Sequence, residues 1–428
     1  ITGGAGANSI TGGAGADTLT GGDGADTLIG GTGADTFVVG VVTDFAAGET
    51  VTGGANAGGV DTLRLDDAGT YGNTVMSATL TGVEVVSLNE NAAGFALTFA
   101  DGAYIGADAN GDGSADETVT VSAAVALTND VSITGGATTG THELVVDGTN
   151  LGGNDTITGG AGADDLDGGA GADDLDGGAG ADTLTGGDGD DTFEFDVGIA
   201  SHIPSLDTLI DGGDGSDTMF VWRGDGMVLT LEDADFENVA NMESLDVRRG
   251  GDSHPISVTL GAEASDAFAN GITITQTNAS TLTVNGSAFT KAITATGGAG
   301  DDTIAGGGGN DTIAGGAGAD NITPGAGTDT IVYNDVAAEG GDTITNFTTA
   351  ADGAGFAAGA DTLQFSSADL AGVAGFVAYT GGGGATLDTD GAGGADVELV
   401  VATGGALVAN AAEAAFLFDT ATGVLTFD

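Results

Sequence analysis

The sequence has no cysteine and only five lysine or arginine residues against 64 aspartate or glutamate residues, giving a formal net charge of −59 over 428 residues. The lack of cysteine excludes disulfides as cross-links in place of a large core. The lack of basic clusters excludes a nucleic-acid partner, because phosphate recognition depends on Lys and Arg. Repulsion among so many carboxylates opposes a compact state unless cations neutralise it. A bound metal is the cross-link that remains.

Aromatic residues make up only 5% of the chain. No stretch of about 18 apolar residues occurs, so a transmembrane segment is not predicted. Catalytic motifs are also missing. His142-Glu143 is followed at the required spacing by Val146 rather than by the second histidine of a His-Glu-x-x-His zinc motif, and there is no Gly-x-Ser-x-Gly nucleophile elbow. The other histidines, His202 and His254, stand in separate contexts. The sequence therefore predicts that the chain is not an enzyme.

Glycine is abundant, at 84 residues, and much of it follows a nine-residue pattern, Gly-Gly-x-Gly-x-Asp-x-apolar-x. Runs of this pattern occupy residues 3–38, 150–195 and 297–332. The alternative interpretation is a flexible linker, but a linker does not place an apolar residue at every ninth position. The glycines permit positive φ and let carbonyl groups crowd inward, while the aspartate supplies a hard oxygen ligand. The last three residues suit a short strand with one inward side chain.

These nonamers resemble the calcium-binding repeats of the RTX family, a pattern typical of β-helical proteins. The resemblance implies an all-β fold, a parallel β-roll in which two nonamers complete one coil. It also implies that about ten Ca²⁺ ions lie between turns stacked on the same side. The side-chain ligands expected from the resemblance are Asp17, Asp26, Asp35, Asp155, Asp164, Asp173, Asp182, Asp191, Asp217, Asp302, Asp311, Asp320 and Asp329. The expected carbonyl ligands include Gly12, Gly21, Gly159, Gly168, Gly177, Gly306 and Gly315.

Departures from the pattern fall at the ends of the runs. Asn8 replaces the first aspartate, Asn150-Leu151 replaces a glycine pair, and Pro324 replaces a glycine. The weakest cation sites are therefore expected at these ends.

Six segments are predicted: RTX blocks at 1–39, 150–195 and 297–332, β-rich segments at 40–149 and 196–296, and a C-terminal β cap at 333–428. Strands that lead directly into nonamers favour a continuous β-solenoid with irregular inserts. An isolated nonamer at 212–220, which contains Asp217, is interpreted as a single orphan turn or a remnant. Residues 341–347 and 359–365 resemble the capping strands of serralysin-type secreted proteins, and residues 59–65 are similar, so all three are predicted to cap a coil.

Two further acidic loops are candidate metal sites. Asp108, Asn110, Asp112 and Asp116 have the spacing with which an EF-hand calcium loop begins, although position twelve is Val119 instead of glutamate. A solvated acidic turn is the alternative interpretation. A weaker version, Asp388-Thr389-Asp390-Gly391 with Asp396 downstream, is either a metal loop or a hairpin turn.

The sequence predicts a secreted, calcium-binding structural protein of the bacterial cell surface, such as an S-layer, filament or adhesin component. It would fold and assemble on binding extracellular Ca²⁺, and its expected partners are copies of itself bridged by Ca²⁺ and a cell-surface polysaccharide. RTX relatives typically leave the cell by type I secretion. The alternative is the C-terminal secretion and stability module of a larger secreted RTX enzyme, a protease, lipase or polysaccharide-active enzyme. Low aromatic content favours the structural protein, because catalytic and sugar-binding clefts usually need more aromatic surface.

Overall fold

The computed structural model describes seventeen stretches of the chain, and the observations below concern these residues alone. They are residues 1–41, 49–55, 60–66, 70–71, 80–89, 95–98, 118–135, 143–196, 207–223, 228–249, 255–276, 280–333, 342–345, 361–365, 398–402, 415–419 and 424–427. The chain divides into two compact units. Unit 1 contains Ile1–Met219 and Asn238–Asn241, and unit 2 contains Phe220–Glu237 and Met242–Asp428.

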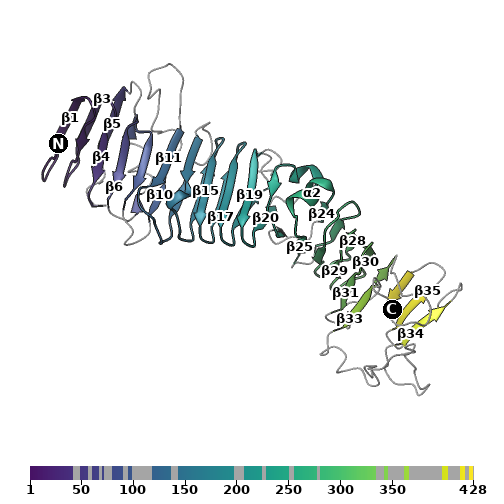
Figure 1. Ribbon diagram of the computed structural model, residues 1–428. Helices are drawn as coiled ribbons and strands as arrows, with labels where there is room; N and C mark the ends of the chain where they lie inside the picture. Colours follow the sequence, from purple (N-terminus) through teal and green to yellow (C-terminus); the bar gives the residue numbers. More distant parts are fainter. Residues whose placement is uncertain are drawn as a thin grey trace. The chain divides into compact units, whose positions relative to one another are not determined.

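Unit 1 consists of short strands that lie side by side in chain order within three sheets (Figure 1). The first sheet contains β1 (Ser9–Ala14), β3 (Thr27–Thr32), β5 (Thr50–Ala55) and β8 (Leu80–Thr81). The second contains β2 (Thr18–Leu19), β4 (Thr36–Val39), β6 (Thr62–Leu65), β9 (Val85–Leu88), β11 (Thr118–Ala123), β13 (Glu143–Asp147), β15 (Asp165–Ala170), β17 (Thr183–Asp188), β19 (Leu209–Asp214) and β22 (Val239–Ala240). The third contains β7 (Thr70–Tyr71), β10 (Ala96–Thr98), β12 (Ser132–Thr134), β14 (Thr156–Gly160), β16 (Asp174–Gly178) and β18 (Thr192–Asp196).

Unit 2 has the same construction, with two sheets of neighbouring strands. One contains β23 (Ser244–Arg249), β25 (Ile272–Thr275), β27 (Ile293–Thr296), β29 (Thr312–Ala314), β31 (Thr330–Tyr333) and β33 (Thr362–Phe365). The other contains β21 (Leu229–Leu231), β24 (Ile256–Thr259), β26 (Leu282–Asn285), β28 (Thr303–Gly307), β30 (Asn321–Gly325), β32 (Thr343–Ile344), β36 (Val424–Phe427), β35 (Ala415–Asp419) and β34 (Glu398–Ala402). Strand β36 is antiparallel to β32 and β35, while the other strand pairs within these two sheets are parallel.

Helical structure is sparse among the described residues. Its main elements are η2 (Gly148–Asn150), η4 (Asp233–Phe236) and α2 (Ala262–Ala267), and β20 (Thr218–Arg223) is the remaining strand. Asp233 holds the start of α2, because its Oδ1 accepts hydrogen bonds from the Gly261 and Ala264 backbone N–H groups at 2.7 and 3.0 Å. None of these helices is long and apolar enough to cross a membrane.

The strand register confirms that two nonamers complete one coil. Ile157 pairs with Leu175, and Leu175 pairs with Phe193, so each partner is one residue of the next coil. Successive nonamers enter alternate sheets, since β14 and β16 lie in one sheet and β15 and β17 in another. The fold of each unit is therefore an all-β parallel β-roll, as the nonamers predict.

The core is a stack of the single apolar side chains at position eight of each nonamer. Leu166, Leu175, Leu184 and Phe193 are fully buried, and the flanking polar residues face outward, as the two-residue period of a strand requires. Each coil therefore contributes very few buried side chains, and the interior is narrow.

Two of the predictions about repeat boundaries are wrong. The nonamer at 212–220 is not an orphan or remnant, because β19 pairs in register with β17, with Gly213 beside Gly187. It is the next coil of the second block. Residues 59–65 do not cap a coil, since β6 lies between β4 and β9 and is parallel to both. Strand pairing sets the register, so a change in spacing along the chain does not end the roll.

We expect Leu184→Ala to lower the free energy of unfolding by about 2–5 kcal/mol, because it leaves a cavity in a stack that cannot collapse inward. Leu184 pairs with Leu166 on one side and Ile210 on the other. Chemical denaturation in calcium-containing buffer measures the loss. Thr185→Ala, on the outer face of the same strand, is the control and should change it by less than about 0.5 kcal/mol. Equal effects would contradict the stacked core.

Candidate metal centre

The sixth-position aspartates form the corners of the coil, and nearly all of them are buried. The exposed fraction of the residue is 2% or less for Asp26, Asp35, Asp155, Asp164, Asp173, Asp182, Asp191, Asp217, Asp302, Asp311, Asp320 and Asp329. Asp17 is partly exposed. An ionised carboxylate in such surroundings is costly unless a hydrogen bond or an opposite charge compensates it.

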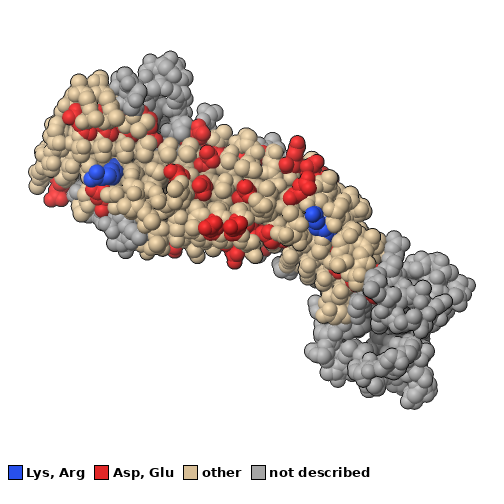
Figure 2. Space-filling model, in the orientation of Figure 1, with Lys and Arg blue, Asp and Glu red and all other residues tan. Residues whose placement is uncertain are grey.

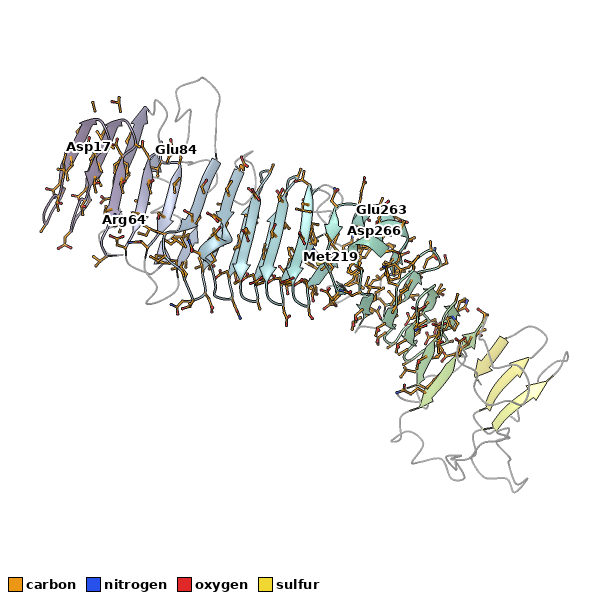
Figure 3. The ribbon with its side chains drawn as sticks, in the orientation of Figure 1. Asp17, Arg64, Glu84, Met219, Glu263 and Asp266 are labelled. Carbon is orange, nitrogen blue, oxygen red and sulfur yellow. The ribbon has the colours of Figure 1, made fainter. Side chains whose placement is uncertain are left out.

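In these aspartates, with the exception of Asp17, one carboxylate oxygen accepts a backbone N–H from the preceding coil. The backbone N–H of Asp155 donates to Oδ1 of Asp173 at 2.7 Å, and the N–H of Asp173 donates to Oδ1 of Asp191 at 2.8 Å. The same relation links Asp17 to Asp35, Asp164 to Asp182, Asp302 to Asp320 and Asp311 to Asp329. The carboxylates therefore form ladders that run from coil to coil. Figure 3 shows Asp17 and Glu84, which belong to one of these ladders.

In nine of these aspartates the second carboxylate oxygen has no hydrogen-bond donor, whereas Oδ2 of Asp311 accepts the Gly307 N–H at 2.8 Å. Oδ2 is buried and without a hydrogen-bond partner in Asp17, Asp26, Asp35, Asp155, Asp164, Asp173, Asp191, Asp302 and Asp329. A buried anionic oxygen without a donor is destabilising. Its recurrence at the same position of most of the repeats indicates a site for a cation.

The first glycine of each repeat lies opposite this oxygen and leaves the space for an ion. A Cβ atom at Gly12 would lie 2.7 Å from both Asp17 Oδ2 and the Gly30 carbonyl oxygen. One at Gly168 would lie 2.6 Å from Asp173 Oδ2 and 2.9 Å from the Gly186 carbonyl oxygen. The corresponding aspartate Oδ2 is also nearest to, or among the nearest atoms to, Gly21, Gly159, Gly177, Gly306 and Gly315. Carboxylate and carbonyl oxygens thus converge where a side chain is absent.

Pro324 and Asn8, two departures from the nonamer pattern, affect their corners differently. Pro324 lacks the glycine's N–H, but its carbonyl oxygen still faces Gly306 together with Asp311 Oδ2, so the corner is kept. Asn8 changes the chemistry of its corner. Its Nδ2 donates to the carbonyl oxygens of Gly4, at 3.1 Å, and Gly6, and approaches Oδ1 of Asp26 at 3.2 Å. An amide donor thus satisfies oxygens at a corner where an aspartate would supply only acceptors.

Sequence reasoning missed the carboxylates that continue the ladders beyond the regular repeats. Asp61, Asp207, Asp342 and Asp361 accept hydrogen bonds from the N–H groups of Asp35, Asp182, Asp320 and Asp329, and Glu49 and Glu84 accept from Asp26 and Asp61. All four aspartates carry a weak signal, an Asp-Thr-apolar triplet that matches positions six to eight of the nonamer, at residues 61–63, 207–209, 342–344 and 361–363. The glutamates carry no such signal.

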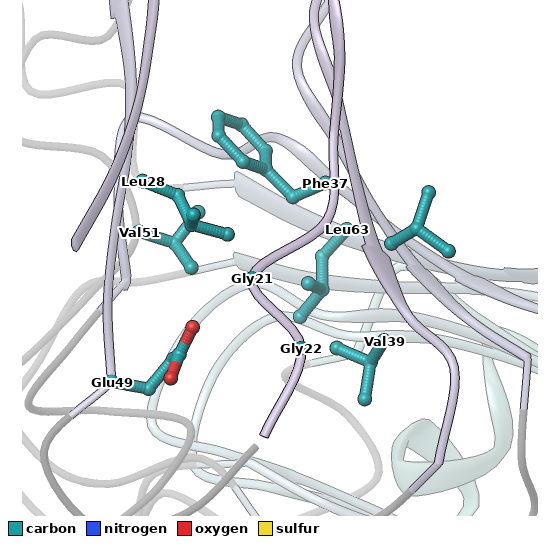
Figure 4. Close-up of a pocket in the computed structure, with 9 residues that line it drawn as sticks. Gly21, Gly22, Leu28, Phe37, Val39, Glu49, Val51 and Leu63 are labelled. Carbon is teal, nitrogen blue, oxygen red and sulfur yellow. The ribbon is translucent and has the colours of Figure 1, made fainter. Parts of the chain in front are cut away.

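Glu49 closes the ladder that contains Asp26, and it borders a cavity (Figure 4). The cavity is lined mainly by apolar side chains, including Leu28, Phe37 and Val51, together with the backbone of Gly21. The Glu49 residue is only 3% exposed, and its Oε2 accepts the Asp26 N–H at 3.0 Å. The longer side chain of glutamate thus takes the place of the aspartate that the repeat would supply.

Burial raises the pKa of several corner carboxyls in the second and third blocks and of Asp207. Desolvation raises the pKa to about 6 for Asp155, Asp173, Asp182, Asp191 and Asp329, to about 7 for Asp164 and Asp207, and to about 8 for Asp302. Asp66 shows the contrast, because its hydrogen bond from Arg64, at 2.8 Å, lowers its pKa. Among the described residues, Asp155, Asp164 and Asp173 have no such basic partner.

The donor set fits a hard divalent cation. Ca²⁺ takes six to eight oxygen ligands from carboxylates, backbone carbonyls and water. Among the described residues, no group of three or more His, Asp or Glu side chains converges as a metal cluster. Each corner therefore offers one carboxylate or two, with backbone carbonyls. The EF-hand-like loop with Asp108, Asn110, Asp112 and Asp116, the loop at 388–396 and the three histidines lie outside the described residues.

We expect Gly168→Ala to weaken cation binding, because the added methyl group would occupy the point where Asp173 Oδ2 and the Gly186 carbonyl converge. The overpacking should cost about 1–3 kcal/mol. A calcium titration followed by circular dichroism should shift its midpoint to higher calcium. Gly4→Ala is the matched control, since its Cβ would have no heavy atom within 4 Å. Equal midpoints for the two variants would exclude a cation at this corner.

We also expect the calcium-depleted protein to become less stable as the pH rises from about 5 to about 8. The pKa of corner groups such as Asp164 is raised to about 7 in the folded chain, above the ordinary value of 3.8. The folded state then binds more protons than the unfolded state between these values, so stability falls as the protons leave. Thermal melts after treatment with a chelating resin measure the slope. A melting temperature that rises over this range would contradict the assignment.

Comparison with known families agrees with this geometry. The family model of the RTX calcium-binding nonapeptide repeat matches residues 2–37, 151–175, 167–199, 209–228 and 296–331. No match was found among curated proteins or solved structures. The matched segments contain the first, second and third runs and the coil with Asp217, and such repeats indicate a secreted calcium-binding protein. The chain therefore contains RTX calcium-binding nonapeptide repeats in these segments.

Proposed function

We propose that this chain is a calcium-dependent structural protein of the bacterial cell surface, a component of an S-layer, a filament or an adhesin. The observation that carries the proposal is a set of buried Oδ2 atoms without a hydrogen-bond partner that each converge with a glycine carbonyl oxygen, those of Asp17, Asp35, Asp164, Asp173, Asp191 and Asp302. A protein with this interior needs cations in order to fold. About ten ions would occupy the corners of the three blocks.

The corner aspartates divide their two oxygens between two tasks in this proposal. Oδ1 accepts a backbone N–H from the preceding coil, as Asp173 does from Asp155. Oδ2 and the facing carbonyl oxygens would hold Ca²⁺, which supplies the positive charge that the chain lacks. The proposed ligands are the predicted aspartates and glycines of the three blocks and Asp217, with Asp182, Asp311 and Asp320 included because Oδ2 in each faces its glycine.

Because of mass action, the stability of the fold depends on the calcium concentration, which differs between the outside of the cell and the cytosol. Extracellular calcium modules bind with dissociation constants of about 10⁻⁴–10⁻³ M. A site at ten times its dissociation constant stabilises the folded state by about 1.4 kcal/mol, and several sites acting together equal the stability of a domain. The same sites contribute almost nothing at cytosolic calcium concentrations. The chain would therefore stay unfolded inside the cell, pass through a type I secretion channel, and fold outside.

Acidic side chains on the outer faces of the strands support the proposal that copies of the chain assemble after folding. Asp188 and Asp214 are exposed and lie directly side by side on β17 and β19. Like charges in such pairs are destabilising, so a divalent cation would be attracted to them. Figure 2 shows acidic side chains spread over the face in view, with few basic ones among them. Ca²⁺ shared between such faces of neighbouring copies would join them, and a cell-surface polysaccharide is a second candidate partner.

The proposal assigns the chain no catalytic role. The family comparison finds RTX repeats alone, and the corner carboxylates are committed to the ladders. The observation that would favour an enzyme, a base and a nucleophile within reach of each other, is not provided by the described residues around the corners.

The test is to compare the chain in excess EGTA and in millimolar calcium by circular dichroism and sedimentation. At pH 8, where most of the raised-pKa corner carboxyls have lost their protons, we expect the strand signal to appear only with calcium, and large assemblies to form with calcium and dissolve in EGTA. An unchanged strand signal in EGTA would refute calcium-dependent folding. A calcium-loaded chain that folds but remains monomeric at high concentration would refute the structural role and favour a module of a larger secreted enzyme.

A further inference from the structure

The rows of corners in unit 1 continue past residue 37, where the first family match ends. Asp35 is 1% exposed and its Oδ2 has no hydrogen-bond partner. This oxygen faces Gly30 together with the carbonyl oxygen of Gly53, which would lie 2.7 Å from a Cβ at Gly30. Gly53 lies outside the matched repeats, and the sequence pattern assigns it no role. Gly53, which lies in the segment between the first and second RTX runs, thus completes the corner of Asp35.

The next corner in the same row is built entirely from the intervening segment. Gly53 faces Oδ2 of Asp61 and the carbonyl oxygen of Gly82, both closer to the position of a Cβ than any side chain tolerates. Asp61 is fully buried, and its Oδ1 accepts the Asp35 N–H at 2.7 Å. These are the relations that Asp173 has with Gly168 and the preceding coil.

Gly82 reaches this position because its backbone is left-handed, with φ of 63°. The same conformation occurs at Asn241, with φ of 53°, whose carbonyl oxygen faces Gly212 beside Asp217 Oδ2. Glycine and asparagine are the residues that adopt it most readily. In both places a left-handed residue supplies the carbonyl oxygen that the first glycine of a nonamer would supply.

Glu84 ends the row. Its Oε2 accepts the Asp61 N–H at 2.6 Å, so the ladder of Asp17, Asp35 and Asp61 closes on a glutamate. Asp61 therefore has both ladder bonds that a repeat aspartate makes, one through its carboxylate and one through its backbone.

We propose that Gly53, Asp61 and Gly82 form an additional divalent-cation site, a discontinuous repeat assembled from three separate stretches of the chain. Oδ2 of Asp61 and the Gly82 carbonyl oxygen would hold the ion, and Ca²⁺ is the expected species because the donors are hard oxygens. The inference rests on the proposed function, since it extends the same mode of binding to residues outside the nonamers.

Asp61→Asn tests the site, and the chain itself contains the precedent. Asn8 places an amide N–H donor against corner carbonyl oxygens. An asparagine at position 61 can keep Oδ1 on the Asp35 N–H and direct its amide toward the Gly82 carbonyl oxygen, so the fold is retained without the ion. We expect the calcium-saturated variant to remain folded by circular dichroism and to bind at least one ion fewer than the unchanged chain, counted by equilibrium dialysis.

Asp23→Asn is the matched control, because Asp23 is an exposed turn residue in the same unit and the substitution removes the same charge. It should bind as many ions as the unchanged chain. An Asp61→Asn variant with the ion count of the control would overturn the site, and so would one that fails to fold in saturating calcium, since the amide is expected to replace the ion. The response of the unchanged chain to EGTA decides the proposed function separately.

Discussion

The structure depends on one electrostatic constraint, the burial of carboxylate oxygens at the corners of the roll, such as Oδ2 of Asp164, Asp173 and Asp191, without a hydrogen-bond donor to meet them. A chain with 64 acidic and five basic residues cannot supply the missing charge from its own side chains. Burial raises the pKa of Asp302 to about 8, which shows how strongly the interior opposes the charged form. A divalent cation converts this cost into a cross-link between coils.

The corner aspartate is suited to this task because its two oxygens are separated by the fold. Oδ1 is committed to a backbone N–H of the neighbouring coil, which holds the carboxylate in a fixed orientation. Oδ2 is then directed toward the glycine that leaves room beside it. Hydrogen bonding thus fixes the orientation of the ligand in the folded coil, and the ladder links each site to the next. Cooperative binding along a row is the natural consequence, because one coil positions the ligands of two corners.

The narrow core explains why the fold needs such corners. Each nonamer buries a single apolar side chain, such as Leu166 or Leu175, and the outward residues are polar. Hydrophobic burial of one side chain contributes about 1.5–3 kcal/mol, which is small against the entropy of ordering nine residues. A protein of this kind can be unfolded where calcium is scarce and folded where it is abundant. That property suits a chain that acts outside the cell.

The nonamer period determined the strand positions in the repeats and the places of the corner aspartates, because period, glycine placement and apolar position are local properties of the sequence. That two nonamers complete one coil was implied by the resemblance to RTX repeats and confirmed by the strand register. The tertiary structure alone decided which other carboxylates join the ladders. Ladder partners are 18 residues apart inside the repeats, but the partners of Asp320, Asp26, Asp182, Asp35 and Asp329 are 22, 23, 25, 26 and 32 residues away. Strand pairing restores the register after intervals of any of these lengths. A fixed spacing therefore could not reveal that residues 59–65 continue the roll, that the nonamer at 212–220 belongs to the second block, or that Glu49 and Glu84 close two ladders.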